Sequence, residues 1–199
     1  MDILKYEKSF SSKGYTNIVG IDEAGRGPLA GPVVAASVII EEKHLPNEIN
    51  DSKKVSEKNR DTFYEVIIKN ATEYGIGIVD SDEIDKINIH NATLEAMKRA
   101  YKNIKEDEYR VYIDGIFKPN INGKLLAIKH GDRIVPIISA ASILAKVTRD
   151  RIMIQIDKEF PMYNFKKHKG YPTKHHIEMI YKHGICKYHR KSFKPISML

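Results

Sequence analysis

The chain has 199 residues, of which 42% are hydrophobic and 9% aromatic, and its formal net charge is +7. This length and apolar content exclude a disordered chain and favour a single domain over residues 1–199. The single cysteine excludes a disulfide scaffold and a thiolate-rich metal site. No apolar run approaches the ~20 residues that a membrane span requires, and residues 1–14 lack a signal-peptide core. We therefore expect a cytoplasmic protein that does not enter a membrane.

The positive charge is concentrated near the C-terminus. Residues 166–194 contain nine Lys or Arg and one acid, together with five of the eight histidines and three tyrosines. Basic residues interleaved with aromatic rings suit a polyanion whose sugars or bases can stack. A solvated basic surface without a ligand explains the charge alone equally well. Of these cations, we expect Lys166, Lys167 and Lys169 to contact duplex phosphates.

Apolar runs and amphipathic spacing alternate along the chain. In chain order they predict strand 17–21, strand 33–40, helix 56–71, strand 73–79, helix 80–87, helix 91–104, strand 110–113, strand 125–128, helix 139–160 and helix 173–183. Ser56, Asp80 and Ser139 are the expected N-caps of three of these helices. The pattern predicts an α/β layered sheet with residues 161–199 as a basic helical extension on one side.

Acidic residues follow three of the predicted strands. Asp22 and Glu23 follow the first strand, Asp114 follows strand 110–113, and Asp132 follows strand 125–128. Each alone fits a solvated turn residue, but ligand groups in open α/β sheets gather at the carboxyl ends of strands. Four carboxylates in a small volume repel one another, and hard divalent cations such as Mg²⁺ or Mn²⁺ would neutralise them. Two such ions are a recurring device for displacement at phosphorus.

Two features of the sequence bear on which acids can share one site. Asp22 and Glu23 are neighbours, so on a regular strand they point to opposite faces and can serve one site only where the strand is ending. Asp150 is a rival to Asp132, but it lies four residues after Lys146 in a predicted helix. A surface ion pair with Lys146 is therefore the simpler explanation for Asp150.

The Gly/Pro-rich turn after the first strand contains an arginine between two glycines, which chain reversal alone does not explain. With this turn, the sequence resembles the type 2 ribonuclease H family, also called ribonuclease HII. The segments that carry the resemblance are GIDEAGRGPLAGP (20–32), DSKK (51–54), NIHNATLEAM (88–97), YIDG (112–115), HGD (130–132), ISAASILAKVTRDR (138–151), HKGYPT (168–173) and HRKSF (189–193). They occur in the family's order, and the resemblance covers roughly residues 17–195.

The resemblance implies a fold, an active site and a substrate. The implied fold is a ribonuclease H-like mixed β-sheet flanked by helices, with a helical C-terminal extension. The implied catalytic and metal-binding acids are Asp22, Glu23, Asp114 and Asp132. Main-chain groups of Gly25, Arg26 and Gly27 are implied to contact a ribose 2′-OH, Tyr171 to stack on the neighbouring sugar, and Lys53 to lie near the reacting phosphate.

The expected function is therefore a metal-dependent endoribonuclease. Its expected substrates are the RNA strand of RNA–DNA hybrids and ribonucleotides embedded in duplex DNA, cleaved with two Mg²⁺ or Mn²⁺ ions to leave 5′-phosphate and 3′-hydroxyl ends. The alternatives are a non-catalytic binder of hybrid duplex and a different two-metal nuclease on the same fold. The five C-terminal histidines lack an acidic companion cluster, so we do not expect Zn²⁺. A monomer is the default expectation.

Overall fold

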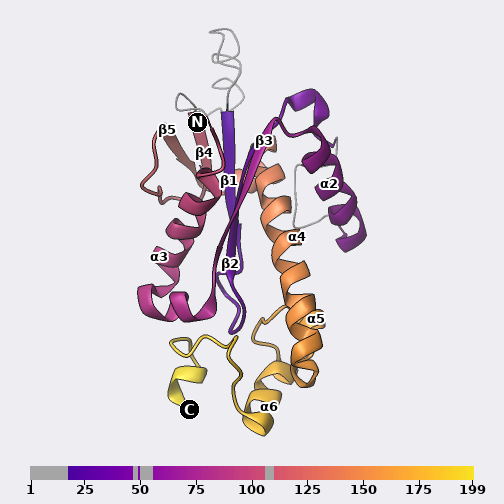
Figure 1. Ribbon diagram of the computed structural model, residues 1–199, viewed down its shortest axis with the longest axis vertical. Coiled ribbons are helices and arrows are strands. Elements are labelled where there is room, and N and C mark those ends of the chain that lie inside the picture. The colour runs from indigo at the N-terminus through magenta and orange to yellow at the C-terminus, as the bar shows by residue number, and fades with distance from the viewer. Residues whose placement is uncertain (1–17, 47–48, 50–55, 106–109) are drawn as a thin grey trace.

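The computed structural model describes residues 18–46, 49, 56–105 and 110–199 (Figure 1). Its strands are β1 (Ile18–Ala24), β2 (Val33–Ile39), β3 (Glu73–Val79), β4 (Arg110–Asp114) and β5 (Lys124–Ile128). Its α-helices are α2 (Glu57–Asn70), α3 (Ser81–Tyr101), α4 (Pro136–Glu159), α5 (Phe165–His168) and α6 (Lys174–His183). Four short 3₁₀ helices are η1 (Glu42–His44), η2 (Gly131–Arg133), η3 (Pro161–Tyr163) and η4 (Ile196–Met198).

The five strands form one mixed sheet in the order β3-β2-β1-β4-β5. β1 and β2 pair antiparallel, as do β2 and β3, whereas β1 and β4 pair parallel, as do β4 and β5. Because β1, β4 and β5 run in the same direction, their carboxyl ends lie at the same edge of the sheet. The acids that follow or end these strands are thereby brought to one edge.

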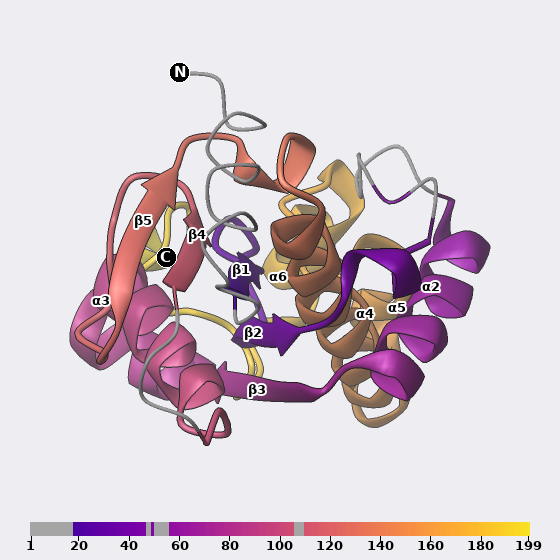
Figure 2. The ribbon, with the colours of Figure 1, turned by 90° about the horizontal axis from the view of Figure 1, so that it is seen from above.

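Helices cover both faces of the sheet, as the view from above shows (Figure 2). One face packs its apolar side chains against α3, and the other packs against α4, which α2 covers in turn. Glycines permit the closest approaches between the layers. A Cβ atom at Gly77 would lie 1.9 Å from the Ala96 carbonyl oxygen on α3, and one at Gly20 would lie 2.3 Å from the Ile137 carbonyl oxygen on α4. Larger residues at these positions would push a helix off the sheet.

Most of the predicted elements are confirmed, including two of the three named caps. Ser56 and Asp80 accept hydrogen bonds from backbone N–H groups in the first turns of α2 and α3. The two helices predicted over 80–104 form a single element, α3, that is broken at Asn88, whose φ is 63°. The Asn88 side chain accepts hydrogen bonds from the N–H groups of His90 and Asn91 and so starts the second half.

The start of the longest helix was predicted wrongly. α4 begins at Pro136 with Val135 as its N-cap, so Ser139 lies inside the first turn and does not cap it. The buried Ser139 hydroxyl donates instead to the Asp132 carbonyl oxygen at 2.7 Å. Pro136 is well placed because proline lacks the N–H that a first-turn residue would leave unpaired. The serine therefore ties the helix to the segment that carries Asp132.

The elements after α4 pack beside its C-terminal half, at the opposite end of the molecule from the described start of β1 (Figure 1). They enclose an apolar cluster that includes Met153 and Ile156 of α4, Phe165 of α5 and Ile180 of α6. Leu29 and Ala30, from the loop between β1 and β2, are buried in the same cluster. The extension and this loop therefore share one core. No helix in the described parts of the chain is long and apolar enough to cross a membrane.

Candidate active site

The predicted acids meet where β1 and β4 stop pairing. The last residue pair of the β1–β4 ladder is Ile21 with Ile113, and Asp22 and Asp114 follow directly on the two strands. Asp132 lies on η2, is 2% exposed, and its backbone N–H donates to Asp114 Oδ1 at 3.3 Å. β1 continues to Ala24 through its pairing with β2, so the strand is longer than the predicted 17–21. Glu23 is therefore still part of the strand, so the expectation that the strand ends at this pair of acids is wrong.

Asp22 and Glu23 point to different faces of the sheet, as alternation along a strand requires. Asp22 is 4% exposed and lies toward α4, where it is hydrogen-bonded by the Ser142 side chain. Glu23 lines a pocket of about 270 Å³ on the α3 side, with Asp114, Arg26, His90, Phe117 and Lys129. Both carboxylates still interact electrostatically with Asp114. Asp114 therefore interacts with both acids of β1.

The electrostatics of these acids are unfavourable without a cation. Burial raises the pKa of Asp22 well above its usual value, and the charges of Glu23 and Asp114 raise it further. Burial also raises the pKa of Glu23, although the Arg26 guanidinium opposes this shift. Arg26 Nη1 lies 3.4 Å from Glu23 Oε1, and its side chain is about half exposed. One partly solvated arginine thus balances only part of the negative charge.

The donor chemistry of this site fits a hard divalent cation. The four acids supply only carboxylate oxygens, the ligands that Mg²⁺ and Mn²⁺ prefer, and a cation would remove the repulsion that raises the pKa values. Within the described residues, no three His, Cys, Asp or Glu side chains are close enough to hold a single ion as they stand.

Two buried arginines hold the Gly-rich loop, residues 25–32, through its carbonyl groups. Arg190 donates to the carbonyl oxygens of Gly25, Arg26 and Gly31 at 2.6–3.0 Å. Arg149 of α4 donates to the carbonyl oxygens of Pro32 at 2.9 Å and Ala30 at 3.1 Å. Both side chains are almost completely buried. They fix the backbone of a loop that contains no regular secondary structure.

Gly25 is required by this arrangement. Its φ is +98°, a backbone conformation that residues other than glycine rarely adopt, and a Cβ atom would lie 2.1 Å from Arg149 Nε. Any larger residue would displace the arginine that holds the loop. The segment Gly25–Arg26–Gly27 thus has a shape set by its neighbours, with Arg26 directed back toward Glu23.

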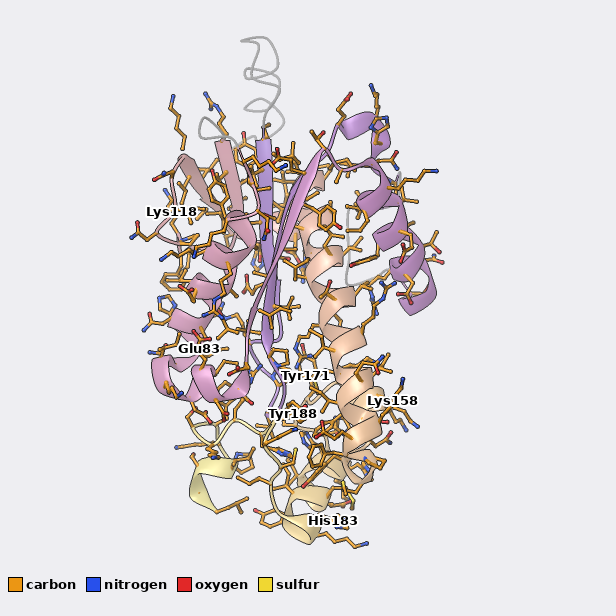
Figure 3. All side chains as sticks on the ribbon, viewed as in Figure 1. Glu83, Lys118, Lys158, Tyr171, His183 and Tyr188 are labelled. Carbon is orange, nitrogen blue, oxygen red and sulfur yellow. The ribbon has the colours of Figure 1, made fainter. Side chains whose placement is uncertain are left out.

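Tyr171 lies beside this loop, as Figure 3 shows. A Cβ atom at Gly27 would be 3.8 Å from the Tyr171 ring, which is 43% exposed, and Arg149 lies 6.0 Å from the ring centre. The preceding residue, Gly170, accepts a backbone hydrogen bond from Leu29 at 2.8 Å. The structure therefore brings the Gly-Arg-Gly segment and Tyr171 together, although 144 residues separate Gly27 from Tyr171 in the sequence.

The predicted lysines differ in their surroundings. Lys166 and Lys167 are exposed, and Lys166 Nζ is 3.9 Å from Asp157 Oδ2, too far for a hydrogen bond. Lys169 is half-buried and its ammonium group donates to the Lys166 carbonyl oxygen. Lys53 lies outside the described residues. Among the three lysines that the structure describes, Lys166 and Lys167 are thus the two with exposed side chains.

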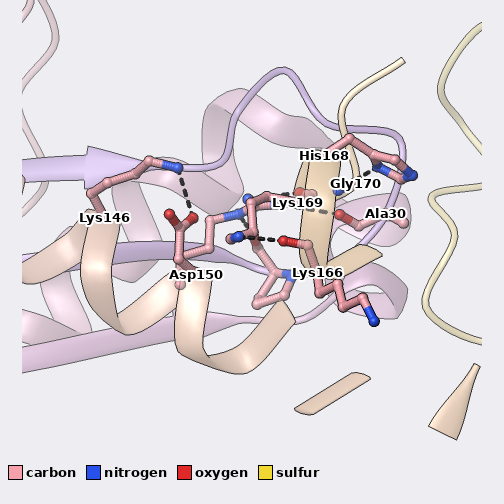
Figure 4. Close-up of polar contacts among 9 residues, drawn as sticks. Ala30, Lys146, Asp150, Lys166, His168, Lys169 and Gly170 are labelled. Carbon is pink, nitrogen blue, oxygen red and sulfur yellow. Dashed lines mark hydrogen bonds and ion pairs between the residues drawn. The ribbon is translucent and has the colours of Figure 1, made fainter. Parts of the chain in front are cut away.

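Asp150, the rival to Asp132, pairs with Lys146 Nζ at 2.6 Å on α4, as the spacing predicted (Figure 4). The interpretation as a surface pair was wrong in one respect, because Asp150 is only 8% exposed. Burial lowers the pKa of Lys146, and Asp150 opposes that shift. The pair is thus a partly desolvated contact between α4 side chains. Asp132, in contrast, is hydrogen-bonded to Asp114.

A family model described as Ribonuclease HII matches residues 19–196. The chain belongs to the ribonuclease HII family. Members of this family are metal-dependent endoribonucleases. The Ribonuclease HII of Caldicellulosiruptor bescii is 49% identical over 187 residues, which are 94% of this chain and 91% of that protein.

Two solved structures show the same fold. The ribonuclease H2 of Pyrococcus horikoshii OT3 matches with a TM-score of 0.76 at 24% identity, over 92% of this chain and 96% of that one. A Bst-RNase HIII structure in complex with Mn²⁺ matches with a TM-score of 0.67 at 15% identity, over 84% of this chain and 63% of that one. The ribonuclease H-like mixed sheet expected from the sequence is thereby confirmed.

Sequence reasoning missed the residues that shape the Gly-rich loop of this ribonuclease HII chain. Arg190 was counted only in the basic stretch and in the segment 189–193, Arg149 appeared only in the segment 138–151, and Ser142 only as part of a helix start. A signal for Arg149 was present, because Ala145, Arg149 and Met153 follow one another at four-residue spacing on the buried face of α4. A charged residue on an apolar helix face needs partners, and here the partners are loop carbonyls. Arg190 carried no comparable signal, because it follows the last α-helix.

Proposed function

We propose that this protein hydrolyses the RNA strand of RNA–DNA hybrids and cleaves duplex DNA at embedded ribonucleotides. The observation that carries this proposal is that the acids at the end of β1 and β4 adjoin a loop whose backbone is fixed by Arg149 and Arg190 and faced by Tyr171. Acids near a reacting phosphate and a rigid backbone near a sugar are what ribonucleotide-specific cleavage requires. Family membership supports the same conclusion.

Recognition of RNA depends on the 2′-OH, which both donates and accepts a hydrogen bond. Main-chain groups of Gly25, Arg26 and Gly27 are the proposed readers of this hydroxyl. Backbone reading ignores base identity, so cleavage is expected to be independent of sequence. The exposed Tyr171 ring is the proposed platform for the neighbouring sugar, and its hydroxyl adds a polar contact. The fixed shape of the loop means that little ordering is needed when the substrate binds.

Asp22, Glu23, Asp114 and Asp132 are the proposed ligands of two Mg²⁺ or Mn²⁺ ions. Two bound ions supply an activated water and stabilise the charge that develops on the phosphate, which gives a 5′-phosphate and a 3′-hydroxyl. Asp114 interacts electrostatically with both acids of β1, so the three carboxylates would act together in holding the ions. Arg26, the partial counterion of Glu23, is free to turn toward the substrate once a cation neutralises that carboxylate. The Mn²⁺ of the Bst-RNase HIII structure supports a divalent ion for this fold.

Lys166, Lys167 and Lys169 are the proposed phosphate contacts along the duplex, and Lys53 the proposed contact near the reacting phosphate. A non-catalytic duplex binder is disfavoured because the acids would repel a phosphate and contribute nothing to affinity. A nuclease that ignores the 2′-OH is disfavoured because it would need neither the Gly-Arg-Gly segment nor Tyr171. We expect the protein to act as a cytoplasmic monomer.

One assay tests the proposed function. A labelled DNA duplex with a single ribonucleotide is incubated with the protein in Mg²⁺, Mn²⁺ or chelator, beside an all-DNA duplex of the same sequence and a long RNA–DNA hybrid. We expect a single cut at the ribonucleotide and cuts in the RNA of the hybrid, all abolished by chelator. Binding without cutting supports the non-catalytic alternative, and cutting of the all-DNA duplex supports the other nuclease.

Tyr171 gives a sharper test of the proposed reading. Tyr171→Phe keeps the stacking ring and loses one hydroxyl, whereas Tyr171→Ala loses both. Because stacking is worth roughly 1–3 kcal/mol, Tyr171→Ala should lower kcat/KM at a single ribonucleotide by at least about tenfold, and Tyr171→Phe by less. A long hybrid offers many 2′-OH groups and should be affected less. Equal losses on both substrates would show that Tyr171 supports folding or general binding instead.

A further inference from the structure

Two histidines are buried beneath the segment that carries Tyr171, and the chemistry proposed above uses neither. His176 of α6 and His189 of the C-terminal segment are both fully buried, and their Nε2 atoms lie 3.1 Å apart. His176 Nδ1 lies 2.9 Å from the Tyr171 carbonyl oxygen. At the other end, the backbone N–H of Cys186 donates to His189 Nδ1 at 2.9 Å. The four groups form a continuous chain of hydrogen bonds.

The partners at the two ends assign the protons of both rings. A carbonyl oxygen only accepts, so His176 carries its proton on Nδ1 and leaves Nε2 bare. A backbone N–H only donates, so His189 leaves Nδ1 bare and carries its proton on Nε2. The Nε2–H of His189 then donates to Nε2 of His176. One arrangement with both rings neutral satisfies every bond, and a second proton on either ring breaks at least one of them.

The surroundings of the pair favour this neutral state. From α5, the His168 ring stacks on His176 with centroids 4.5 Å apart, and His168 is itself fixed by the Tyr163 carbonyl and the Gly170 N–H. The other titratable groups that face the pair are His175 of α6, Tyr163 of η3 and Cys186, while Asp157 of α4 faces His168. Burial lowers the pKa of His176 and of His189 to about 4.

The pair connects the two parts of the proposed reading site. His189 forms an isolated β-bridge with Ala30 of the Gly-rich loop, so its backbone is attached to that loop. Its ring, through His176, is attached to the Tyr171 carbonyl, which also accepts from the Thr173 N–H at 2.8 Å. A rotation of this carbonyl turns the Tyr171 backbone and moves the ring away from Gly27. The distance between loop and ring therefore depends on the histidine pair.

We propose that His176 and His189 are positioning residues that hold Tyr171 against the Gly-Arg-Gly segment and thereby set the efficiency of cleavage at a single embedded ribonucleotide. The proposal rests on the reading role proposed for Tyr171. Neither histidine touches the substrate. Their effect is expected in the discrimination between a single ribonucleotide and a long hybrid, where many 2′-OH groups reduce the need for an aligned ring.

The first test examines the pair in the free protein and needs no activity. Nitrogen-15 spectra of the histidine rings at pH 7 should show His176 protonated at Nδ1 and His189 at Nε2. Both should stay neutral as the pH is lowered until it approaches their pKa of about 4. The opposite tautomers, or rings that become charged well above this pH, would overturn the proposal.

The second test uses variants of matched size and position. His176→Leu removes the donor to Tyr171, and His176→Asn retains an N–H near the position of Nδ1. The exposed His175→Leu is the control. His176→Leu should lower kcat/KM at a single ribonucleotide by about tenfold, the effect of one lost hydrogen bond at the upper end of the usual range. His176→Asn should recover most of this loss, while the affinity for an all-DNA duplex stays unchanged in all three.

The outcomes separate this proposal from the proposed function. If the wild type and His175→Leu cut no ribonucleotide, the proposed function fails, whereas the tautomers still decide whether the pair exists. If the wild type cuts and His176→Leu loses activity equally on both substrates, the positioning role is overturned. Melting curves identify a variant that does not fold. For that case His189→Asn, which keeps an acceptor for the Cys186 N–H, should give the same substrate preference with a smaller loss.

Discussion

The two ends of the proposed site treat buried charge in opposite ways. At the sheet edge, Asp22 and Glu23 lie beside Asp114, and their pKa values are raised by burial and, in addition, by neighbouring negative charges. Beneath the Gly-rich loop, Arg149 and Arg190 are equally buried, but their N–H groups donate to carbonyl oxygens of the loop and to that of Lys169. The acids are held in an unfavourable state that a cation relieves. The arginines are satisfied before any ligand binds.

This difference explains what each region contributes. Charge that is only partly balanced creates affinity for a ligand of opposite sign and lowers the stability of the free protein. Charge with every partner in place creates a rigid surface and no affinity of its own. A site that must both recruit metal ions and measure a single hydroxyl needs the two kinds side by side. Replacing an acid at the sheet edge should therefore lower activity and raise stability. Replacing a buried arginine beneath the Gly-rich loop should lower stability.

The largest expected effect is on cleavage, from Asp22→Asn. It should lower cleavage by about 1,000-fold or more, equivalent to ~4 kcal/mol of barrier, and raise the melting temperature because one repelling charge is lost. Asp114→Asn should behave similarly, and Asp132→Asn should show a smaller but still large loss. Single-turnover cleavage and thermal melting in chelator measure the two effects.

The control for these variants is Asp150→Asn, which makes the same chemical change at another mostly buried carboxylate. Cleavage should stay within about twofold of the wild type, a change of less than ~0.5 kcal/mol in barrier. If Asp150→Asn is the inactive variant, Asp150 replaces Asp132 as the fourth ligand. If Asp22→Asn stays within about tenfold of the wild type, the acid set is wrong.

The second effect is on stability, from Arg190→Lys. A lysine retains the charge but cannot reach the carbonyl groups of Gly25, Arg26 and Gly31 together. Carbonyls left unpaired in a buried site cost about 1–3 kcal/mol each, so we expect ~3 kcal/mol of destabilisation and a melting temperature lower by roughly 6–12 °C. The exposed Lys191→Ala is the control and should melt within a degree or two of the wild type, since exposed substitutions change little. An unchanged melting temperature for Arg190→Lys would show that the loop does not need its carbonyls fixed.

The third effect concerns exposed charge, which belongs to neither end. Replacing Lys166, Lys167 and Lys169 by alanine should weaken duplex binding and reduce its salt dependence by about 0.9 unit of log–log slope per lost phosphate contact. Titrations of an all-DNA duplex at several salt concentrations measure this slope. Because Lys169 donates to the Lys166 carbonyl, we expect most of the change to come from the other two. An unchanged slope would mean that these lysines face away from the duplex.

The smallest effect is on the pH dependence of stability. The pKa of His176 and of His189 is about 4 in the folded protein, against about 6.5 in an unfolded chain. The unfolded state therefore binds more protons between these values, and stability should fall as the pH decreases from about 6.5 to 4. His176→Asn should make this decrease shallower, as melting curves at several pH values can measure. A slope identical to that of the wild type would show that His176 is not buried in its neutral form.

The sequence predicted the parts of this structure that depend on local pattern. Short apolar runs predicted the five strands of the described sheet, and capping side chains predicted where α2 and α3 begin. The acids were found because the carboxyl ends of parallel strands lie at the same edge of a sheet, which brings the carboxylates that follow these strands close together. Asn88 divided α3 because its own side chain caps the second half. These are all contacts between residues close in sequence or in the sheet register.

The errors and omissions concern contacts that no local pattern encodes. Ser139 was misplaced because its partner, the Asp132 carbonyl, belongs to the segment before the helix and not to the helix itself. The burial of Asp150 and the role of Arg149 depend on which segments cover α4. Arg190 binds carbonyls 159 and more residues away along the chain. Such partners become visible only when the chain is folded.

The burial of Leu29 and Ala30 in the core of the extension has a consequence for protein engineering. The Gly-rich loop cannot be transplanted as a cassette: residues 20–32 grafted onto another sheet of this topology would carry two apolar side chains with nowhere to pack, and carbonyls with no arginine beneath them. A chimera in which only residues 161–199 were exchanged would leave Leu29 and Ala30 without the residues that they pack against. The loop and residues 161–199 therefore have to be exchanged together, and substitutions in one are tolerated only when the other accommodates them.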